Sequence, residues 1–160
     1  MNSFGEHGNL AQDRAEQATP LVFVVDDNPQ NCELIVGFLD DLDVDLKIFT
    51  SGQDALEACE ARVPDLVVLD VMMPRLSGYQ VCERLRADER TARIPIILLT
   101  ALNESADVER GLEAGADDFL VKPVQRMELV TRVHAQLAVR SCEARVQSVV
   151  AGLRSVFSLA

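Results

Sequence analysis

Five side chains that could take part in chemistry lie where apolar runs of the sequence end. The acidic pair Asp26 and Asp27 follows one run, Asp70 ends a second, and Thr100 and Lys122 end two more. Carboxylates held close together raise one another's pKa, and a hard divalent cation such as Mg²⁺ relieves this conflict. Such a set predicts phosphoryl transfer in which Asp70 is the nucleophile and forms an aspartyl phosphate. Thr100 would then bind phosphoryl oxygens through its hydroxyl, and Lys122 through its ammonium group.

Each of these residues also has an ordinary structural explanation. An acidic pair after a strand often belongs to a turn, and a threonine at a strand end is commonly structural. A Lys-Pro pair usually has no functional role. The hypothesis therefore rests on the whole ordered set and not on any member of it.

The apolar runs have the pattern of strands in a parallel sheet. Central parallel strands are buried on both faces and form continuous aliphatic runs without polar alternation. The predicted strands are Leu21–Val25, Asp45–Phe49, the run that ends at Asp70, Ile94–Leu99 and Asp118–Val121. Leu46 and Ile48 alternate with polar neighbours, which places the second strand at an edge of the sheet.

Helical segments lie between these strands. The first begins at Pro29 with Asn28 as its cap, the second spans Gln53–Ala61 after the cap Ser51, the third ends near Asp88, the fourth spans Ala106–Glu113, and the last begins near Gln125. This alternation predicts an α/β fold of the doubly wound type, with five parallel strands and five helices. If the first and third strands are neighbours, their carboxyl ends lie about 4.8 Å apart, and the three acidic side chains would converge at that edge of the sheet.

Length and charge limit the classes of function. A chain of 160 residues with 48% hydrophobic residues suits one domain with appendages. Its formal charge of −11 would repel a phosphate backbone or an anionic membrane, so neither nucleic acid nor a membrane is an expected partner. Because no apolar run approaches the roughly 20 residues of a membrane span, we expect a cytoplasmic protein.

The cysteines do not form a metal-binding pattern. Cys32, Cys59, Cys82 and Cys142 are widely spaced, with no Cys-x-x-Cys pair and no nearby histidine. They are predicted to be buried thiols in a reducing compartment, not zinc ligands.

The sequence continues beyond the last helix that such a fold requires. This helix is predicted to bury Met127, Val130, Val133 and Leu137. Apolar residues then recur at spacings of three and four, at Val146, Val149, Leu153, Val156 and Ala160. The seam predicts a helical extension that joins two copies of the chain or connects it to another protein or module.

Several motifs in a fixed order resemble those of one family. They are Val24-Val25-Asp26-Asp27-Asn28, Leu69-Asp70-Val71-Met72-Met73-Pro74, Leu99-Thr100-Ala101 and Asp118-Phe119-Leu120-Val121-Lys122-Pro123. Over about residues 21–138 the chain resembles the receiver domain of two-component response regulators. This resemblance implies a flavodoxin-like sheet with the strand order 2-1-3-4-5, and a last helix that is extended. On this basis we expect a receiver domain at residues 21–140 and a helical extension at 141–160. Residues 1–20 are polar and aperiodic, so they are expected to form a disordered tail.

The resemblance implies a role for each residue of the acidic site. Asp70 takes the position of the phosphoacceptor. Asp27 takes that of a direct Mg²⁺ ligand, with Asp26 acting through water, and the backbone carbonyl of Met72 would be a further ligand.

The resemblance also implies a switch on the neighbouring strands. Thr100 takes the position of the switch hydroxyl and Lys122 that of the phosphate-binding lysine, whose peptide bond to Pro123 is expected to be cis. Phe119 lies where the family has an aromatic that moves inward with the threonine, although a plain core phenylalanine is nearly as good an explanation.

The function implied is a signalling switch that is not otherwise an enzyme. Asp70 would accept a phosphoryl group from a sensor histidine kinase or a phosphotransfer protein, and the domain would change its preference for an output partner. One alternative is the front module of a larger protein with a diguanylate cyclase or phosphatase output domain. An aspartyl-phosphate phosphatase is disfavoured because residues 26–30 lack the motif Asp-x-Asp-x-Thr. A flavodoxin-like cofactor binder is disfavoured because no Ser/Thr/Gly-rich phosphate loop follows the first strand.

Overall fold

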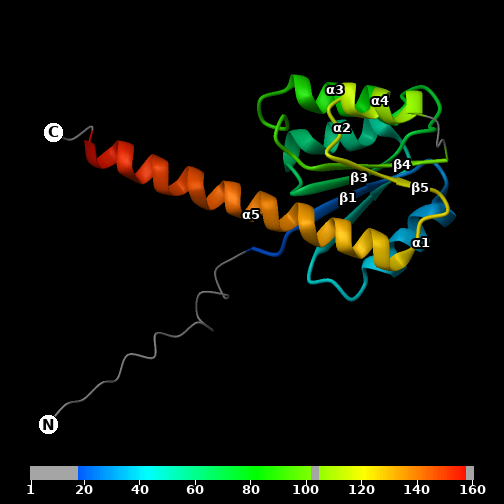
Figure 1. The fold of residues 1–160 in the computed structure, drawn as a ribbon, viewed down its shortest axis with the longest axis horizontal. Coiled ribbons are helices and arrows are strands. Elements are labelled where there is room, and N and C mark those ends of the chain that lie inside the picture. Colours follow the sequence, from blue (N-terminus) through cyan, green and yellow to red (C-terminus); the bar gives the residue numbers. More distant parts are fainter. Residues whose placement is uncertain (1–17, 102–104, 158–160) are drawn as a thin grey trace, which may run out of the picture.

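A computed structural model describes residues 18–101 and 105–157 of the chain (Figure 1). The elements in chain order are β1 (Leu21–Val25), α1 (Pro29–Leu39), β2 (Asp45–Phe49), α2 (Gly52–Ala61), β3 (Leu66–Asp70), α3 (Gly78–Ala87), β4 (Ile96–Thr100), α4 (Ser105–Glu113), β5 (Asp118–Val121) and α5 (Arg126–Phe157). The strands form one parallel sheet in the order β2-β1-β3-β4-β5, which confirms the predicted flavodoxin-like topology. The tail predicted for residues 1–20 lies, as far as residue 17, outside the described residues.

Helices cover both faces of the sheet (Figure 1). On one face, residues of α2 and α3 pack against the strands in an apolar cluster that includes Phe23, Leu69 and Leu98. On the other face, α1 and α5 pack against a second cluster built on Val24 and Val68. Because β1, β3 and β4 are buried throughout, their unbroken apolar runs follow from contact with helices on both sides.

The strand register aligns the carboxyl ends of β1, β3, β4 and β5. Val25 lies beside Leu69, Asp70 beside Leu99, and Thr100 beside Val121. The residues that follow β1 and β5, and those that end β3 and β4, are therefore brought to the same edge of the sheet.

Polar side chains fix where the helices begin. Asn28 accepts a hydrogen bond from the backbone N–H of Gln30, and Ser51 accepts one from that of Asp54, so both predicted caps are confirmed. Ser77 and Gln80 form a reciprocal capping box at the start of α3.

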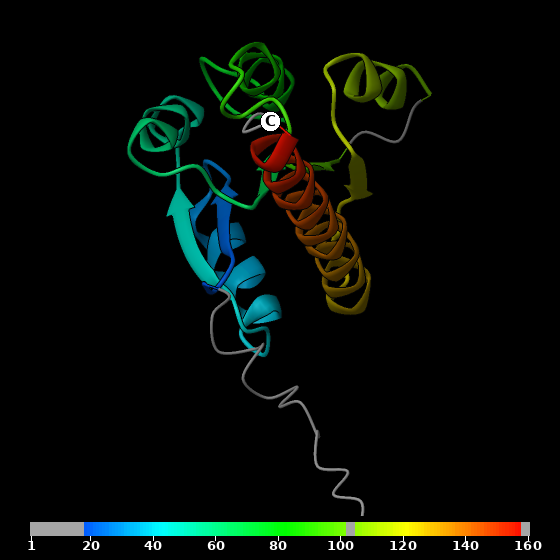
Figure 2. The same cartoon turned by 90° about the vertical axis from the view of Figure 1, so that its left-hand side faces the viewer.

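The last helix is 32 residues long and projects beyond the domain (Figures 1 and 2). Its predicted buried stripe is partly wrong, because Met127 is 71% exposed whereas Leu129 and Val133 are fully buried. Despite the length of α5, no helix in the described part of the chain is long and apolar enough to cross a membrane. The prediction for the cysteines is also partly wrong, since Cys142 on α5 is exposed while the other three are buried.

Arg86 on α3 ties together the segments that flank β4 and β5. Its guanidinium donates to the carbonyl oxygens of Gly115 (2.8 Å), Ala92 (3.2 Å) and Ile94 (2.6 Å). It also pairs with Asp117 at 2.7 Å. A side chain with five N–H donors is needed to satisfy this set of acceptors.

We expect Arg86→Ala to lower the free energy of unfolding by about 3 kcal/mol, because several partly buried acceptors lose a charged donor at once. Urea unfolding measures this loss. Arg84→Ala is the matched control, since Arg84 on the same helix is exposed and contacts Gln53 at 3.4 Å, and it should change stability by less than about 0.5 kcal/mol. Equal losses in the two variants would contradict the role given to Arg86.

Candidate functional site

Three carboxylates gather at the carboxyl edge of the sheet. Asp26, Asp27 and Asp70 each offer an oxygen, and these oxygens all lie within 4.8 Å of one another. Asp26 and Asp70 are buried, with 1% and 3% of their surface exposed, whereas Asp27 is exposed. The cluster is therefore open to solvent on one side and closed by the domain on the other.

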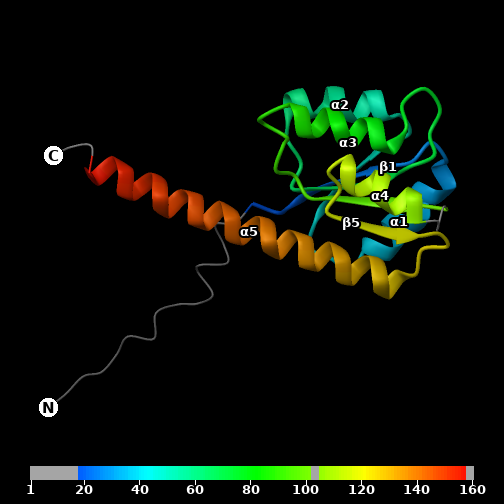
Figure 3. The same ribbon diagram turned by 45° about the horizontal axis from the view of Figure 1, so that its top comes forward.

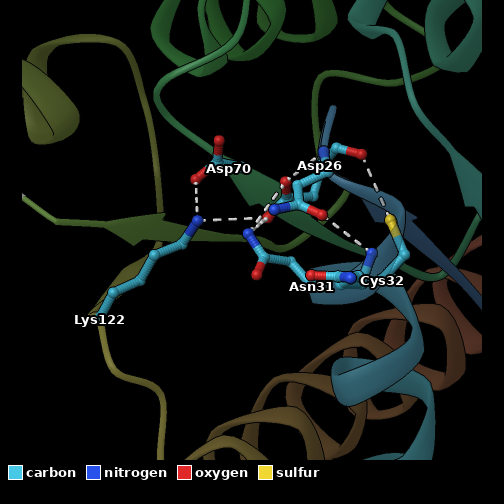
Figure 4. A network of polar contacts seen from close by, with 7 residues as sticks. Asp26, Asn31, Cys32, Asp70 and Lys122 are labelled. Atoms are coloured by element: carbon cyan, nitrogen blue, oxygen red, sulfur yellow. Dashed lines mark hydrogen bonds and ion pairs between the residues drawn. The ribbon is translucent and has the colours of Figure 1, made fainter.

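Lys122 reaches this cluster from the end of β5 (Figure 4). Its Nζ lies 2.6 Å from an Asp70 oxygen and 3.2 Å from Asp26 Oδ2. Within the described residues, the ammonium of Lys122 pairs with two of the three clustered carboxylates, and Asp27 adds a third negative charge. An excess of negative charge remains, and it favours binding of a cation.

The charges shift the protonation equilibria of the site. Burial raises the pKa of the Asp70 carboxyl, the hydrogen bond from Lys122 opposes this rise, and the neighbouring charge of Asp26 adds to it. Burial disfavours the charged form of Lys122, but its contacts with Asp70 and Asp26 outweigh this effect and raise the pKa of the ammonium group. Lys122 therefore stays charged at neutral pH, and a further positive charge would stabilise ionised Asp70.

Asp26 is held by the start of α1, including a residue that the sequence analysis missed. Its Oδ1 accepts from the backbone N–H of Asn28 at 2.9 Å, and the side-chain amide of Asn31 donates to its two oxygens at 3.1 and 3.4 Å. The Cys32 thiol donates to the Asp26 carbonyl at 3.3 Å (Figure 4). Asn31 lies five residues after Asp26, in the first turn of α1, and this placement could have indicated its contact with the carboxylate.

The other predicted residues lie around the cluster. Thr100 is buried at the end of β4, and its carbonyl accepts from the backbone N–H of Lys122 at 2.7 Å. Phe119 is half-buried and lines a small cavity with Thr100 and Tyr79. Met72 follows β3 with its side chain 63% exposed. The Lys122–Pro123 peptide is cis, as the resemblance implies.

The donor set suits a hard divalent cation. Mg²⁺ prefers oxygen ligands and is commonly held by one or two carboxylates together with waters and phosphate oxygens. The three clustered carboxylates, two of which pair with Lys122, provide such oxygens at a partly open position. The triad could therefore hold a metal ion.

Comparison with known proteins identifies the domain. The family described as "Response regulator receiver domain" matches residues 22–134. The DNA-binding response regulator MtrA of Mycolicibacterium smegmatis is 43% identical over 116 residues, which cover 72% of this chain and 50% of MtrA. The chain spans about half the length of the first curated relatives it matches.

Solved receiver domains share the fold. The receiver domain of the sensor histidine kinase PA1611 from Pseudomonas aeruginosa, solved with a magnesium ion in its active site cleft, is 33% identical with a TM-score of 0.70, and the match covers 76% of this chain and 99% of that one. The BeF3-activated receiver domain of DrrB, a Thermotoga maritima OmpR/PhoB homologue, is 33% identical with a TM-score of 0.69, at 76% and 99% coverage. The chain therefore belongs to the receiver domain family of two-component response regulators.

Proposed function

We propose that this receiver domain is a phosphorylation-dependent switch in which Asp70 accepts the phosphoryl group. The donor would be a phosphohistidine of a partner histidine kinase or phosphotransfer protein. An Asp70 oxygen would attack phosphorus while the phosphorus–nitrogen bond breaks and the imidazole nitrogen keeps the electron pair. The observation that carries this proposal is the position of Asp70, which is buried at the end of β3 beside two further carboxylates and 2.6 Å from Lys122.

The residues around Asp70 fit a bound Mg²⁺. The side chains of Asp26, Asp27 and Asp70 and the backbone carbonyl of Met72 would hold it. When bound, the ion would neutralise charge on the phosphoryl oxygens and on the carboxylates. The magnesium ion in the PA1611 receiver domain supports this assignment, since that domain is 33% identical to this chain.

Lys122 and Thr100 would act on the phosphoryl group itself. The ammonium of Lys122 already contacts Asp70, so it would neutralise an oxygen of the transferred group. Thr100 would donate a hydrogen bond from its hydroxyl and move toward the phosphate. Phe119 lines a cavity with Thr100 and could follow that movement by packing alone, because it has no hydroxyl to bond.

This switch would change the preference of the domain for an output protein or module. The receiver domain would span residues 21–140, and a helical extension would span residues 141–160. Pairing of two copies through the extension is a separate proposal, because it rests on residues outside the acidic site.

Intact-mass spectrometry tests the proposed function. After incubation with acetyl phosphate and Mg²⁺, the chain should gain the mass of one phosphoryl group, and this gain should be lost when Mg²⁺ is removed with a chelator. Asp70→Asn should gain nothing, because an amide oxygen is a poor nucleophile. A phosphoryl group that appears equally on the Asp70→Asn variant would refute the assignment.

Asn31 is expected to support the metal site by holding the Asp26 carboxylate in place. Removing a residue that orients a metal ligand commonly weakens metal binding by about 10-fold or more, and we expect Asn31→Ala to have this effect on the dissociation constant of Mg²⁺. Isothermal titration calorimetry with Mg²⁺ alone provides the measurement. Gln30→Ala, at the neighbouring exposed position of α1, should leave the constant unchanged. Equal Mg²⁺ affinities of the parent and Asn31→Ala would exclude this role.

A further inference from the structure

The projecting part of α5 repeats every seven residues. In the sequence the three heptads are 139–145 (VRSCEAR), 146–152 (VQSVVAG) and 153–159 (LRSVFSL), and the last two residues of the third lie outside the described residues. In each heptad the first residue is valine or leucine, the third is serine, and the fourth is cysteine or valine. Apolar first and fourth positions sustained over three heptads are the pattern of a coiled coil.

These positions form an exposed row, which we call the outer stripe: Val139, Cys142, Val146, Val149 and Leu153. Cys142 is exposed, and the four aliphatic side chains are between 53% and 62% exposed. Single exposed apolar residues are ordinary, but a continuous row of them on a soluble domain indicates a contact surface.

The outer stripe faces away from the domain to which it belongs. Leu129 and Val133 bury the inner face of α5 against the sheet. Thirteen residues separate Val133 from Val146, and at about 100° per residue this rotation carries Val146 roughly to the opposite side of the helix. The apolar face of α5 therefore changes sides near residue 138. Because the C-terminal part of α5 also projects from the domain (Figures 1 and 3), the stripe is left uncovered by its own domain.

The inner face of the projecting part has a different character. Ser141, Ala144 and Ser148 line a groove of about 460 Å³, together with Arg140, Arg145 and residues of the segment that leads into β1. Beyond Leu137, small, polar and charged side chains thus face the domain, while the aliphatic side chains of the outer stripe face outward. Packing within one copy of the chain does not explain this arrangement.

We propose that the outer stripe is a self-association surface that packs against the outer stripe of a second copy. Because each heptad has the same residue types at its first and fourth positions, the stripe of one copy can pack against the stripe of another. The charged residues of the projecting part of α5, Arg140, Glu143, Arg145 and Arg154, lie off the stripe, so pairing buries no charge. With three arginines and one glutamate, this part of α5 carries a net positive charge, whereas the whole chain carries −11. The projecting part of one copy is therefore attracted to the acidic domain of the other.

The size of the stripe limits the strength of this contact. Three heptads contribute about a dozen residues a side, roughly half of the 20–30 that a standard interface uses. The pairing is therefore weak, with a dissociation constant on the order of micromolar or above. It does not depend on the phosphorylation proposed for Asp70.

Sedimentation equilibrium of the full chain under reducing conditions tests this proposal from about 1 µM to about 1 mM, the range in which so small an interface associates. The mass should rise with concentration from 17.6 kDa toward twice that value. Val149→Glu should hold the mass at 17.6 kDa throughout, because a carboxylate cannot be buried in the stripe. Cys142→Ser should associate as the parent does, which excludes a disulfide as the cause.

Ser148→Glu is the matched control, because it adds the same charge one residue earlier on the inner face. It should associate as the parent does, and circular dichroism should give the same melting temperature for both glutamate variants. A parent that stays monomeric over the whole range would overturn the proposal. Association of Val149→Glu as strong as that of the parent, or an equal loss in Ser148→Glu, would overturn the assignment to the stripe.

Discussion

Alanine in place of Gly78 is expected to lower the free energy of unfolding by about 3 kcal/mol or more, a large effect for one methyl group. A Cβ at this position would lie 2.3 Å from the carbonyl oxygen of Asp70 and 2.8 Å from the Cα of Val71. Both are backbone atoms at the end of β3, so no side-chain rotation can relieve the clash. The backbone N–H of Gly78 also donates to the Val71 carbonyl at 2.9 Å, which holds the start of α3 against this strand.

Gly37→Ala is the control for this experiment. Gly37 lies inside α1, and a Cβ there would meet nothing within 4 Å. Alanine should therefore stabilise the helix by up to about 1 kcal/mol. Urea unfolding of the two variants should give shifts of opposite sign, and a Gly78→Ala variant as stable as the parent would contradict the close contact between α3 and β3.

Replacement of Lys122 is expected to have the largest effect on phosphoryl transfer after that of Asp70 itself. Loss of a single preorganised donor commonly slows a reaction by about 100- to 1,000-fold, and we expect Lys122→Ala to slow phosphorylation by acetyl phosphate to this extent. The measurement is the rate of the mass gain. Lys47→Ala is the matched control, since Lys47 is the other lysine of the chain and lies exposed on β2.

The same variant should bind Mg²⁺ more tightly than the parent. Lys122 brings positive charge to the carboxylates, so its removal leaves Asp26 and Asp70 without that compensation and favours a cation in its place. Slower phosphorylation together with tighter Mg²⁺ binding would show that the variant lacks the ammonium group but keeps the metal-binding carboxylates in place. Weaker Mg²⁺ binding would indicate that Lys122→Ala disrupts the cluster and would contradict the role given to the ammonium group.

The convergence of the acidic residues could be predicted because it follows from topology. Unbroken apolar runs identify central parallel strands, and such strands end at one edge of their sheet. Asp26, Asp27 and Asp70 therefore had to meet once β1 and β3 were neighbours, and the structure brings them together with Lys122. Their roles in phosphoryl transfer remain predictions.

Contacts that depend on the packing of separate elements could not be predicted from the sequence. The buried face of α5 was misplaced because Met127 and Leu129 are both apolar and lie on different sides of the helix, and only the sheet beneath decides between them. Arg86 is one of two arginines on α3, and apart from Asp117 its acceptors are backbone carbonyls, which any residue supplies. Cys142 was expected to be buried because free cysteines usually are, but it lies where α5 has left the domain.

The most direct test of phosphorylation at Asp70 is to trap the product and locate it. Borohydride reduces an aspartyl phosphate to homoserine, so the chain is phosphorylated with acetyl phosphate and Mg²⁺, reduced and mapped by peptide mass spectrometry. We predict homoserine in place of Asp70, with Asp26 and Asp27 unchanged. Homoserine in place of either of those residues, or a phosphorylated chain that leaves Asp70 intact, would contradict the assignment of Asp70 as the phosphoacceptor.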